Sequence, residues 1–319
     1  MVSPKFRSMD APITSEKKRK GNHAPFSVTQ MLVALELGIA DDAVLQYLDF
    51  FTGVVPVRKV QVLHVVPTFD MFQILYEREA DSVIGNLEFN QEIVNEIANR
   101  IKKRPLEQQS KVAFDVREGN PLEQLLLETE ESEADLVVIG QRTGTTEHGI
   151  LARNLARKAT GNVLIVPEGA AASLRTIVVP IDFSPYSVKA LETAIAIRRA
   201  LPEPVRILCV NVYELPNLNI YLVDKLEDIR RIVQEDRKAA FRTFLSRFAP
   251  EDIESIETDV VERDFSSVSS YILEFATGKS ADLIIAGAKG HSRVERLLLG
   301  SVTEKLLAIN ERIPVMVVR

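Results

Sequence analysis

The sequence lacks the features that would assign it to a membrane or to an oxidising compartment. Its 319 residues include one cysteine, so no intramolecular disulfide and no cysteine-rich metal site can form. No apolar run approaches the roughly 18 residues that a membrane helix needs, and the N-terminus has no hydrophobic core of a signal peptide. Cys209 lies in an apolar run, which predicts a buried thiol. These absences favour a cytoplasmic protein that does not cross a membrane.

An excess of charge of one sign is also missing. The formal net charge is −6, with 39 basic and 45 acidic residues mixed along the chain, which gives no general case for nucleic-acid binding. Residues 1–24 differ from the rest, because they hold a basic cluster at 17–20 and no periodic apolar pattern. We expect a disordered tail there. A basic arm that contacts an anionic partner is the alternative.

The remainder of the chain contains an internal repeat. The segment Glu133–Gly140 matches Ser280–Gly287 at an offset of 147 residues, and a pair near the start of each copy is offset by 146. The last matching pair, Val163–Val166 and Val315–Val318, is offset by 152. Because the matches stay in order at nearly constant spacing, we infer two copies of one domain. The larger last offset indicates that the first copy has lost about five residues in the preceding connection.

Each copy alternates short apolar runs with longer amphipathic ones. In the first copy we expect strands at 28–35, 59–66, 111–116, 135–139 and 163–166, and helices at 42–51, 75–103, 121–131 and 150–159. In the second copy we expect strands at 175–180, 205–212, 256–261, 283–287 and 315–318, and helices at 185–200, 225–248, 266–277 and 301–309. Strand–helix alternation predicts parallel, doubly wound sheets. The predicted architecture is two five-stranded α/β domains, 25–168 and 175–319, joined by a linker at 169–174.

In the second copy, a glycine-containing segment follows the fourth strand. Gly287 and Gly290 precede a nine-residue gap, after which Gly300 and Ser301 begin a helix. Glycines let backbone amides approach phosphate oxygens closely, and the free amides of a helix N-terminus favour an anion. Ligands of open α/β sheets bind beyond this end of the strands. The segment therefore predicts a phosphate-binding loop.

Single residues of this region also have purely structural explanations. Ser301 with Glu304 fits a capping box, and Asp182 fits a turn before Ser184 and Pro185, a good helix start. The basic residues of the loop could be solvated charges: Lys289, His291, Arg293 and Arg296. The combination of glycines, gap and helix start favours phosphate binding over these explanations. Neither a P-loop nor a dinucleotide-binding glycine motif occurs in the chain.

The spacing of this segment resembles a known nucleotide motif. Gly287-x-x-Gly290, nine residues and Gly300-Ser301 reproduce the G-2x-G-9x-G-[ST] pattern of the universal stress protein family, and Val179–Ser184 resembles its first strand. The resemblance covers residues 25–319 as the tandem form of the family. It implies a Rossmann-like fold of the adenine nucleotide alpha hydrolase-like type, and a cytoplasmic ATP-binding protein of the stress response. It also implies that final strands pair at dimer interfaces.

The resemblance further implies where ATP would bind, with or without Mg²⁺. Asp182 would contact adenine, Val212 would help enclose the base, and the glycines with Ser301 would bind ribose and phosphates. The full set of expected binding residues is Pro180, Asp182, Val212, Gly287, Gly290, His291, Gly300 and Ser301. We expect no catalytic residue and no metal ligand from the protein.

The first copy departs from the motif. Glu36 stands where the aspartate should be, and only four residues separate Gly144 from Gly149, which Ile150 follows in place of Ser or Thr. We expect the first copy to keep the fold and to have lost the nucleotide. His64, at the end of its second strand, is interpreted as a packed polar residue.

Three functions remain open from the sequence: an ATP-binding regulator, a weak ATP hydrolase or phosphotransferase, and a ligand-free scaffold. No general base or metal cluster accompanies the loop, so efficient hydrolysis is not expected. The final strands, 163–166 and 315–318, would each be an apolar sheet edge. We expect them to pair with each other as an intramolecular pseudo-dimer. A homodimer of whole chains and a monomer are both compatible with this arrangement.

Overall fold

The computed structural model describes residues 24–38, 40–67, 81–102, 104–144, 148–215, 226–290 and 299–319. The strands of the first half are β1 (Val28–Ala34), β2 (Val57–Val66), β3 (Lys111–Glu118), β4 (Leu136–Gln141) and β5 (Asn162–Pro167). Its helices are α1 (Ala40–Val54), α3 (Asp81–Ile101), α4 (Pro105–Gln109), α5 (Pro121–Glu131) and α6 (His148–Lys158).

The second half repeats this order. Its strands are β6 (Thr176–Pro180), β7 (Arg206–Tyr213), β8 (Ile256–Glu262), β9 (Leu283–Gly287) and β10 (Val315–Val318). Its helices are α7 (Pro185–Ala200), α8 (Leu226–Phe248), the short 3-10 helix η2 (Ile253–Ser255), α9 (Val268–Gly278) and α10 (Ser301–Ile309). Within the described residues, every expected strand and helix is present with ends shifted by a few residues, and the sequence did not predict α4 or η2. Residues 75–80 and 103 of the helix expected at 75–103 lie outside the described residues.

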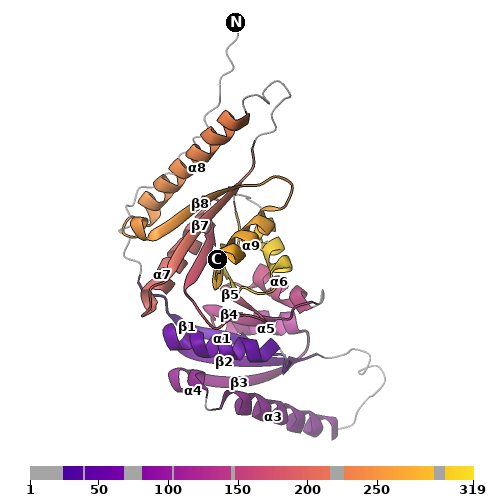
Figure 1. Ribbon diagram of the computed structural model, residues 1–319. Helices are drawn as coiled ribbons and strands as arrows, with labels where there is room; N and C mark the ends of the chain where they lie inside the picture. The colour runs from indigo at the N-terminus through magenta and orange to yellow at the C-terminus, as the bar shows by residue number, and fades with distance from the viewer. Residues whose placement is uncertain are drawn as a thin grey trace.

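All ten strands form one sheet, in the order β3-β2-β1-β4-β5-β10-β9-β6-β7-β8 (Figure 1). Neighbouring strands within each half are parallel. The two halves meet at β5 and β10, which pair antiparallel with Leu164 opposite Met316. The predicted α/β fold with parallel strands is confirmed, and so is the predicted pairing of the two final strands within the chain. Association between whole chains stays a prediction.

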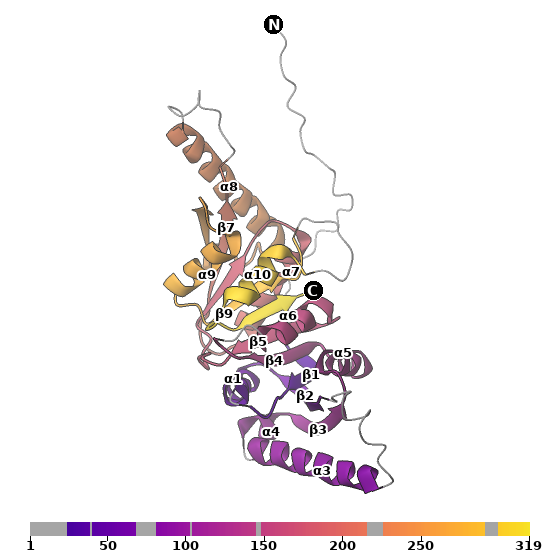
Figure 2. The same cartoon turned by 90° about the vertical axis from the view of Figure 1, so that its right-hand side faces the viewer.

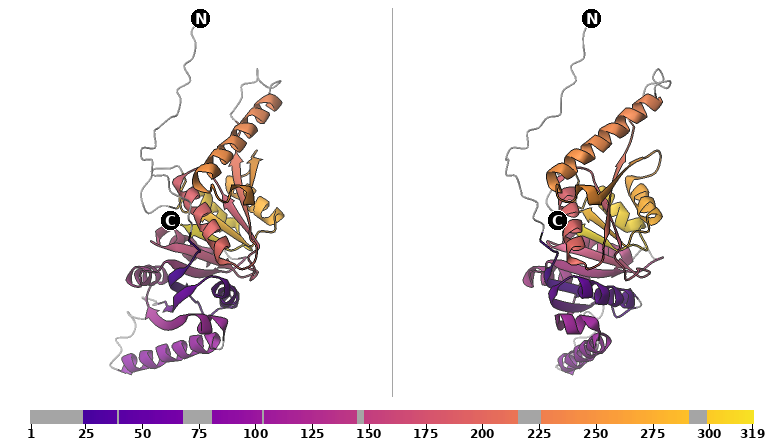
Figure 3. Two further views of the ribbon diagram at one scale, coloured as in Figure 1. Left: turned by 90° about the vertical axis from the view of Figure 1, so that its left-hand side faces the viewer. Right: turned by 60° about the vertical axis from the view of Figure 1, so that its left-hand side comes forward.

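The continuous sheet carries a hydrophobic core on each face. Helices α1, α3, α4, α7 and α8 contribute to one core, and α5, α6, α9 and α10 contribute to the other. Both cores contain residues of both halves, such as Val138 with Ile285 on one face and Val137 with Ile284 on the other. Figure 2 shows the helices of the second core, α5, α6, α9 and α10. Figure 3 shows α3 and α8 at opposite ends of the molecule. The packing therefore joins the halves into one body.

Equivalent side chains stabilise the same points of both repeats. The Asp135 carboxylate accepts hydrogen bonds from the backbone amides of Thr29 and Gln30 at 2.7 and 3.0 Å. The carboxylate of Asp282 does the same for Arg175 and Thr176 at 2.8 and 2.9 Å. Each aspartate thereby ties the start of the fourth strand of its half to the start of the first.

A helix that crosses a bilayer must be about 20 residues long and mostly apolar. Among the described residues, no helix is both long enough and apolar enough to cross a bilayer.

The buried thiol gives a direct test of the packing around β7, in the core that α1, α3, α4, α7 and α8 share. Cys209 is fully buried in β7, and burial raises the pKa of its thiol to about 12. Because the thiolate is the reactive form, the folded protein should not react with a thiol reagent at pH 8, and the unfolded protein should react fully. Reaction is measured by absorbance with and without denaturant. Rapid labelling of the native chain would contradict the described packing of β7.

The pairing of β5 with β10 predicts how the chain unfolds. Leu164 is fully buried in β5 opposite Met316, so Leu164→Ala should lower the free energy of unfolding by about 2–5 kcal/mol. The halves share both cores, so urea should unfold them in a single transition followed by circular dichroism. Leu127 is 45% exposed on α5 and is the matched control, whose alanine variant should change stability by about 0.5 kcal/mol or less. Two separate transitions in the wild type would show that the halves are independent.

Candidate functional site

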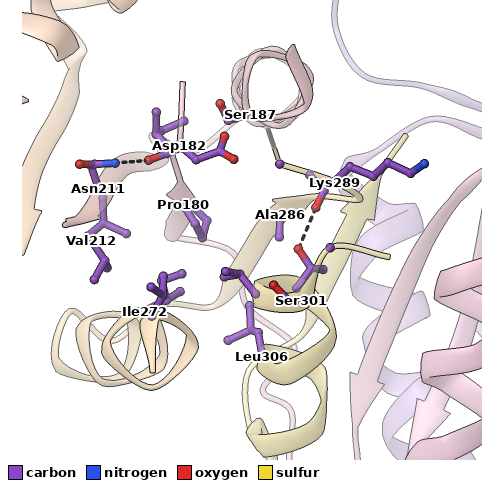
Figure 4. Close-up of a pocket in the computed structure, with 18 residues that line it drawn as sticks. Pro180, Asp182, Ser187, Asn211, Val212, Ile272, Ala286, Lys289, Ser301 and Leu306 are labelled. Carbon is purple, nitrogen blue, oxygen red and sulfur yellow. Dashed lines mark hydrogen bonds between the residues drawn. The ribbon is translucent and has the colours of Figure 1, made fainter. Parts of the chain in front are cut away.

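A cavity of about 270 Å³ lies at the carboxyl ends of β6, β7 and β9, next to the start of α10 (Figure 4). It is the crevice in which ligands bind in open α/β sheets. The residues of the predicted site that line it are Pro180, Asp182, Val212, Gly287, Gly290, Gly300 and Ser301. His291, the eighth, lies outside the described residues, as do Arg293 and Arg296. The fold therefore brings together residues that are more than 100 positions apart in the sequence.

Asp182 links the first strand of this half to the glycine loop. Its Oδ1 accepts a hydrogen bond from the Ser184 amide at 2.9 Å, which is the turn role that the sequence offered as an alternative. Its Oδ2 would lie 2.6 Å from a Cβ atom added to Gly290. A side chain at position 290 would thus displace this carboxylate. The turn role and a place in the cavity wall coexist in one residue.

The turn that carries Asp182 is held in an uncommon backbone conformation. Phe183 has a φ of +64°, a region that residues with a side chain adopt infrequently. Its ring packs edge-on against Phe241 and Phe244 of α8, with centroids 5.4 and 5.6 Å away. Ser184 then caps α7 by accepting a hydrogen bond from the Ser187 amide, with Pro185 at the first helical position. Packing and capping together fix the direction of Asp182.

Gly287 allows β9 to approach the start of α7. A Cβ atom there would lie 2.7 Å from the Tyr186 Cβ and 2.9 Å from the Tyr186 carbonyl oxygen, closer than real Cβ contacts. The first motif glycine is therefore required by packing, in addition to any role toward a ligand.

The start of α10 forms the opposite wall. Gly300 is the N-cap residue and Ser301 is the first helical residue, so the capping box with Ser301 as the N-cap was wrong. The reason is that a glycine is itself an acceptable N-cap, and here its amide donates to the Ala288 carbonyl at 2.7 Å. Thr303 donates its hydroxyl to the Gly287 carbonyl at 2.8 Å. These bonds hold the helix end against the glycine loop.

The other end of the cavity is mainly apolar. Figure 4 shows Val212 and Ile272 there, on the side away from Lys289 and Ser301, and Val268 and Leu306 add further apolar surface to the cavity. The Lys289 side chain extends away from that apolar end (Figure 4). The site therefore has an apolar end and a polar end formed by backbone and by the helix terminus.

Sequence reasoning missed Asn211. Its side chain lines the cavity, is 5% exposed, and donates from Nδ2 to the Ile181 carbonyl at 2.7 Å. Its Oδ1 is buried and has no hydrogen-bond partner among the described residues. A polar residue interrupting the apolar run of β7 was the available signal. His64 takes the equivalent position in the first half, where its Nδ1 lies 2.8 Å from the Leu35 carbonyl oxygen, in accord with a packed polar residue.

The corresponding crevice of the first half holds an ion pair. Arg142, at the position of Lys289, has its guanidinium 3.4 Å from the carboxylate of Glu36, which replaces Asp182. The guanidinium lies directly over Gly38, where an added Cβ would collide with it. The connection from β4 to α6 is residues 142–147, against 288–300 between β9 and α10. The first half thus has a shorter loop after β4, and the side chains of Glu36 and Arg142 lie beside the end of β1.

Within the described ranges, no group of three or more His, Cys, Asp or Glu residues is arranged to hold a metal ion.

Comparison with known proteins agrees with the repeat and the site motif. The model of the universal stress protein family matches residues 30–167 and 173–319. The chain belongs to the universal stress protein family. A curated relative, universal stress protein MJ0531 of Methanocaldococcus jannaschii, is 32% identical over 145 residues, which is 46% of this chain and 82% of the relative.

Solved structures show the same tandem fold. A universal stress protein of Archaeoglobus fulgidus aligns with a TM-score of 0.61 at 20% identity, covering 91% of this chain and 96% of that one. A putative universal stress protein of Pseudomonas aeruginosa aligns with a TM-score of 0.61 at 15% identity, covering 91% and 93%. At such identities the likeness concerns the fold. The tandem universal stress protein architecture inferred from the repeat is thus confirmed.

Two glycine substitutions test how closely the backbone packs around the first and third glycines of the motif. Gly287→Ala should lower the free energy of unfolding by about 1–3 kcal/mol, because its Cβ meets the Tyr186 backbone. Gly300→Ala should cost less, about 0.5–1 kcal/mol, since its nearest new neighbours lie at 3.4–3.5 Å and the main loss is that alanine is a poorer N-cap than glycine. Urea denaturation measures both. Equal losses would contradict the close approach of β9 to α7.

Proposed function

We propose that this universal stress protein binds ATP in its second half and acts in the stress response as a nucleotide-dependent regulator. The observation that carries the proposal is the cavity lined by residues of the G-2x-G-9x-G-[ST] motif and by the end of β6. The residues proposed to bind are Pro180, Asp182, Val212, Gly287, Gly290, Gly300 and Ser301, with His291 as a further candidate.

The apolar end suits the base. Val212, Ile272 and Leu306 can bury the faces of an aromatic ring, and small-molecule sites are commonly apolar with a few polar groups that fix orientation. Asp182 supplies such a group, since a carboxylate oxygen accepts hydrogen bonds from ring or ribose donors. An adenosine moiety offers both the apolar faces and the donors that this end can satisfy.

The polar end suits the phosphates. A helix N-terminus presents free amides and a positive dipole end, which favour negative charge. Gly300 keeps a side chain away from the glycine loop, because a Cβ on Gly300 would lie 3.5 Å from the Gly290 amide nitrogen. Mg²⁺ would enter with the nucleotide, because it is usually bound through phosphates and keeps several of its waters.

We propose that the first half does not bind a nucleotide. In the second half, Asp182 lies close to Gly290. In the first half, Glu36 replaces Asp182 and pairs with Arg142, whose guanidinium lies over Gly38. A ligand would have to break that pair and would find a shorter loop after β4. The asymmetry gives the chain one nucleotide site and one half that serves packing and association.

Titration calorimetry with ATP tests the proposal. The wild type should bind one ATP per chain, and Gly300→Val should weaken binding by at least about tenfold, since its methyl groups crowd the phosphate amides. Circular dichroism and a urea titration establish that the variant remains folded.

A matched valine elsewhere provides the control. Gly169 has open space around its Cβ position, so Gly169→Val should bind ATP as the wild type does. If the folded wild type takes up no ATP at millimolar concentration, the proposed function is wrong.

A further inference from the structure

A charged contact crosses from the first half to the start of α10. The Arg157 guanidinium, in the last turn of α6, pairs with the Glu304 carboxylate in the first turn of α10. The two side chains are 33% and 40% exposed, so the pair is reachable from solvent. It is held in place because β5 and β10 join the halves and set α6 beside α10 (Figure 1).

This contact borders the proposed phosphate end. Ser301 lines the nucleotide cavity and also a second cavity, of about 360 Å³, between α6 and α10. Arg153 and Arg157 of the first half line the second cavity, together with Glu304 and Lys305. Cations of the half without a nucleotide motif are therefore adjacent to the helix terminus where phosphates would bind in the other half.

Because both are anions, Glu304 and a bound phosphate chain would compete for the positive end of α10 and for the Arg157 guanidinium. A carboxylate in the first turn of a helix is favourable when no anion is bound, because it complements the helix dipole. The same carboxylate repels a phosphate at that terminus, and the repulsion grows with the number of phosphate charges. A guanidinium can pair bidentately with a carboxylate or with a phosphate. Arg157 can therefore neutralise Glu304 and attract the end of a longer phosphate chain.

We propose that Arg157 of the first half determines phosphate-chain selectivity at the site of the second half, favouring adenosine triphosphate over adenosine monophosphate. The inference rests on the proposed function, because it concerns the same site. The monophosphate would be held by the glycine loop and Ser301, out of reach of Arg157. The terminal phosphate of the triphosphate would extend past Ser301 toward the guanidinium. The first half would thereby contribute to binding without a nucleotide site of its own.

Calorimetric titration of the full chain with ATP and with AMP tests this inference. Arg157→Ala should weaken ATP binding by roughly tenfold and leave AMP binding unchanged, because a charge-assisted hydrogen bond is lost only with the longer ligand. Arg157→Lys should recover part of the loss, since it restores the charge without the bidentate geometry. Glu304→Gln should tighten ATP binding more than AMP binding, because the repulsion that it removes grows with the phosphate charge. The ratio of the two affinities is thus the decisive quantity.

A control separates this effect from net charge and from folding. Arg206 pairs with Glu257 at the end of β7 opposite the cavity, and Arg206→Ala removes the same charge. It should leave the ATP-to-AMP affinity ratio unchanged, and the melting temperature of each variant reports on folding. Equal weakening of ATP and AMP by Arg157→Ala, or no weakening of either, would overturn the role of Arg157 while leaving the nucleotide site intact. A wild type that binds neither ligand would instead refute the proposed function.

Discussion

The antiparallel pairing of β5 with β10 is the contact on which the other features of the molecule depend. It converts two parallel sheets into one sheet whose two hydrophobic cores are shared. It also sets the end of one half against the helices of the other, as in the bond from Gln141 Nε2 to the Leu307 carbonyl at 3.2 Å. Arg319, at the end of the chain, donates from Nη2 to the Ala156 carbonyl. Because these contacts cross the junction, side chains of the first half lie beside α10, whose start lines the cavity of the second half.

The repeats separate what the fold needs from what the proposed site needs. Asp135 and Asp282 make equivalent bonds, and His64 and Asn211 both contact the carbonyl that follows the first strand. The differences lie in the loops at the strand ends, where Arg142 pairs with Glu36 and lies over Gly38 in one half, and Asp182 approaches Gly290 in the other. A fold can thus be retained under strong packing constraints while its loops lose a binding function. One site per chain is the outcome proposed for this protein.

Much of this organisation could be predicted because the relevant information is local. The boundaries of α7 and α10 match the predicted ones, since Ser184 with Pro185 and Gly300 with Ser301 are strong helix starts. The capping box failed because glycine and serine are both good N-caps, and the sequence does not show which residue leaves the helical conformation. Asn211 and the Glu36–Arg142 pair were missed because their partners are distant in sequence. Such contacts depend on the register of strands and on the path of loops, which no local pattern specifies.

The number of nucleotides bound by one chain tests the central claim most directly. Native mass spectrometry of the full chain titrated with ATP measures it without assuming where the ligand binds. The account predicts saturation at one ATP per chain, because the second half has a cavity at its glycine loop and the first half holds Arg142 over Gly38. Two ATP molecules per chain would contradict the asymmetry of the two halves.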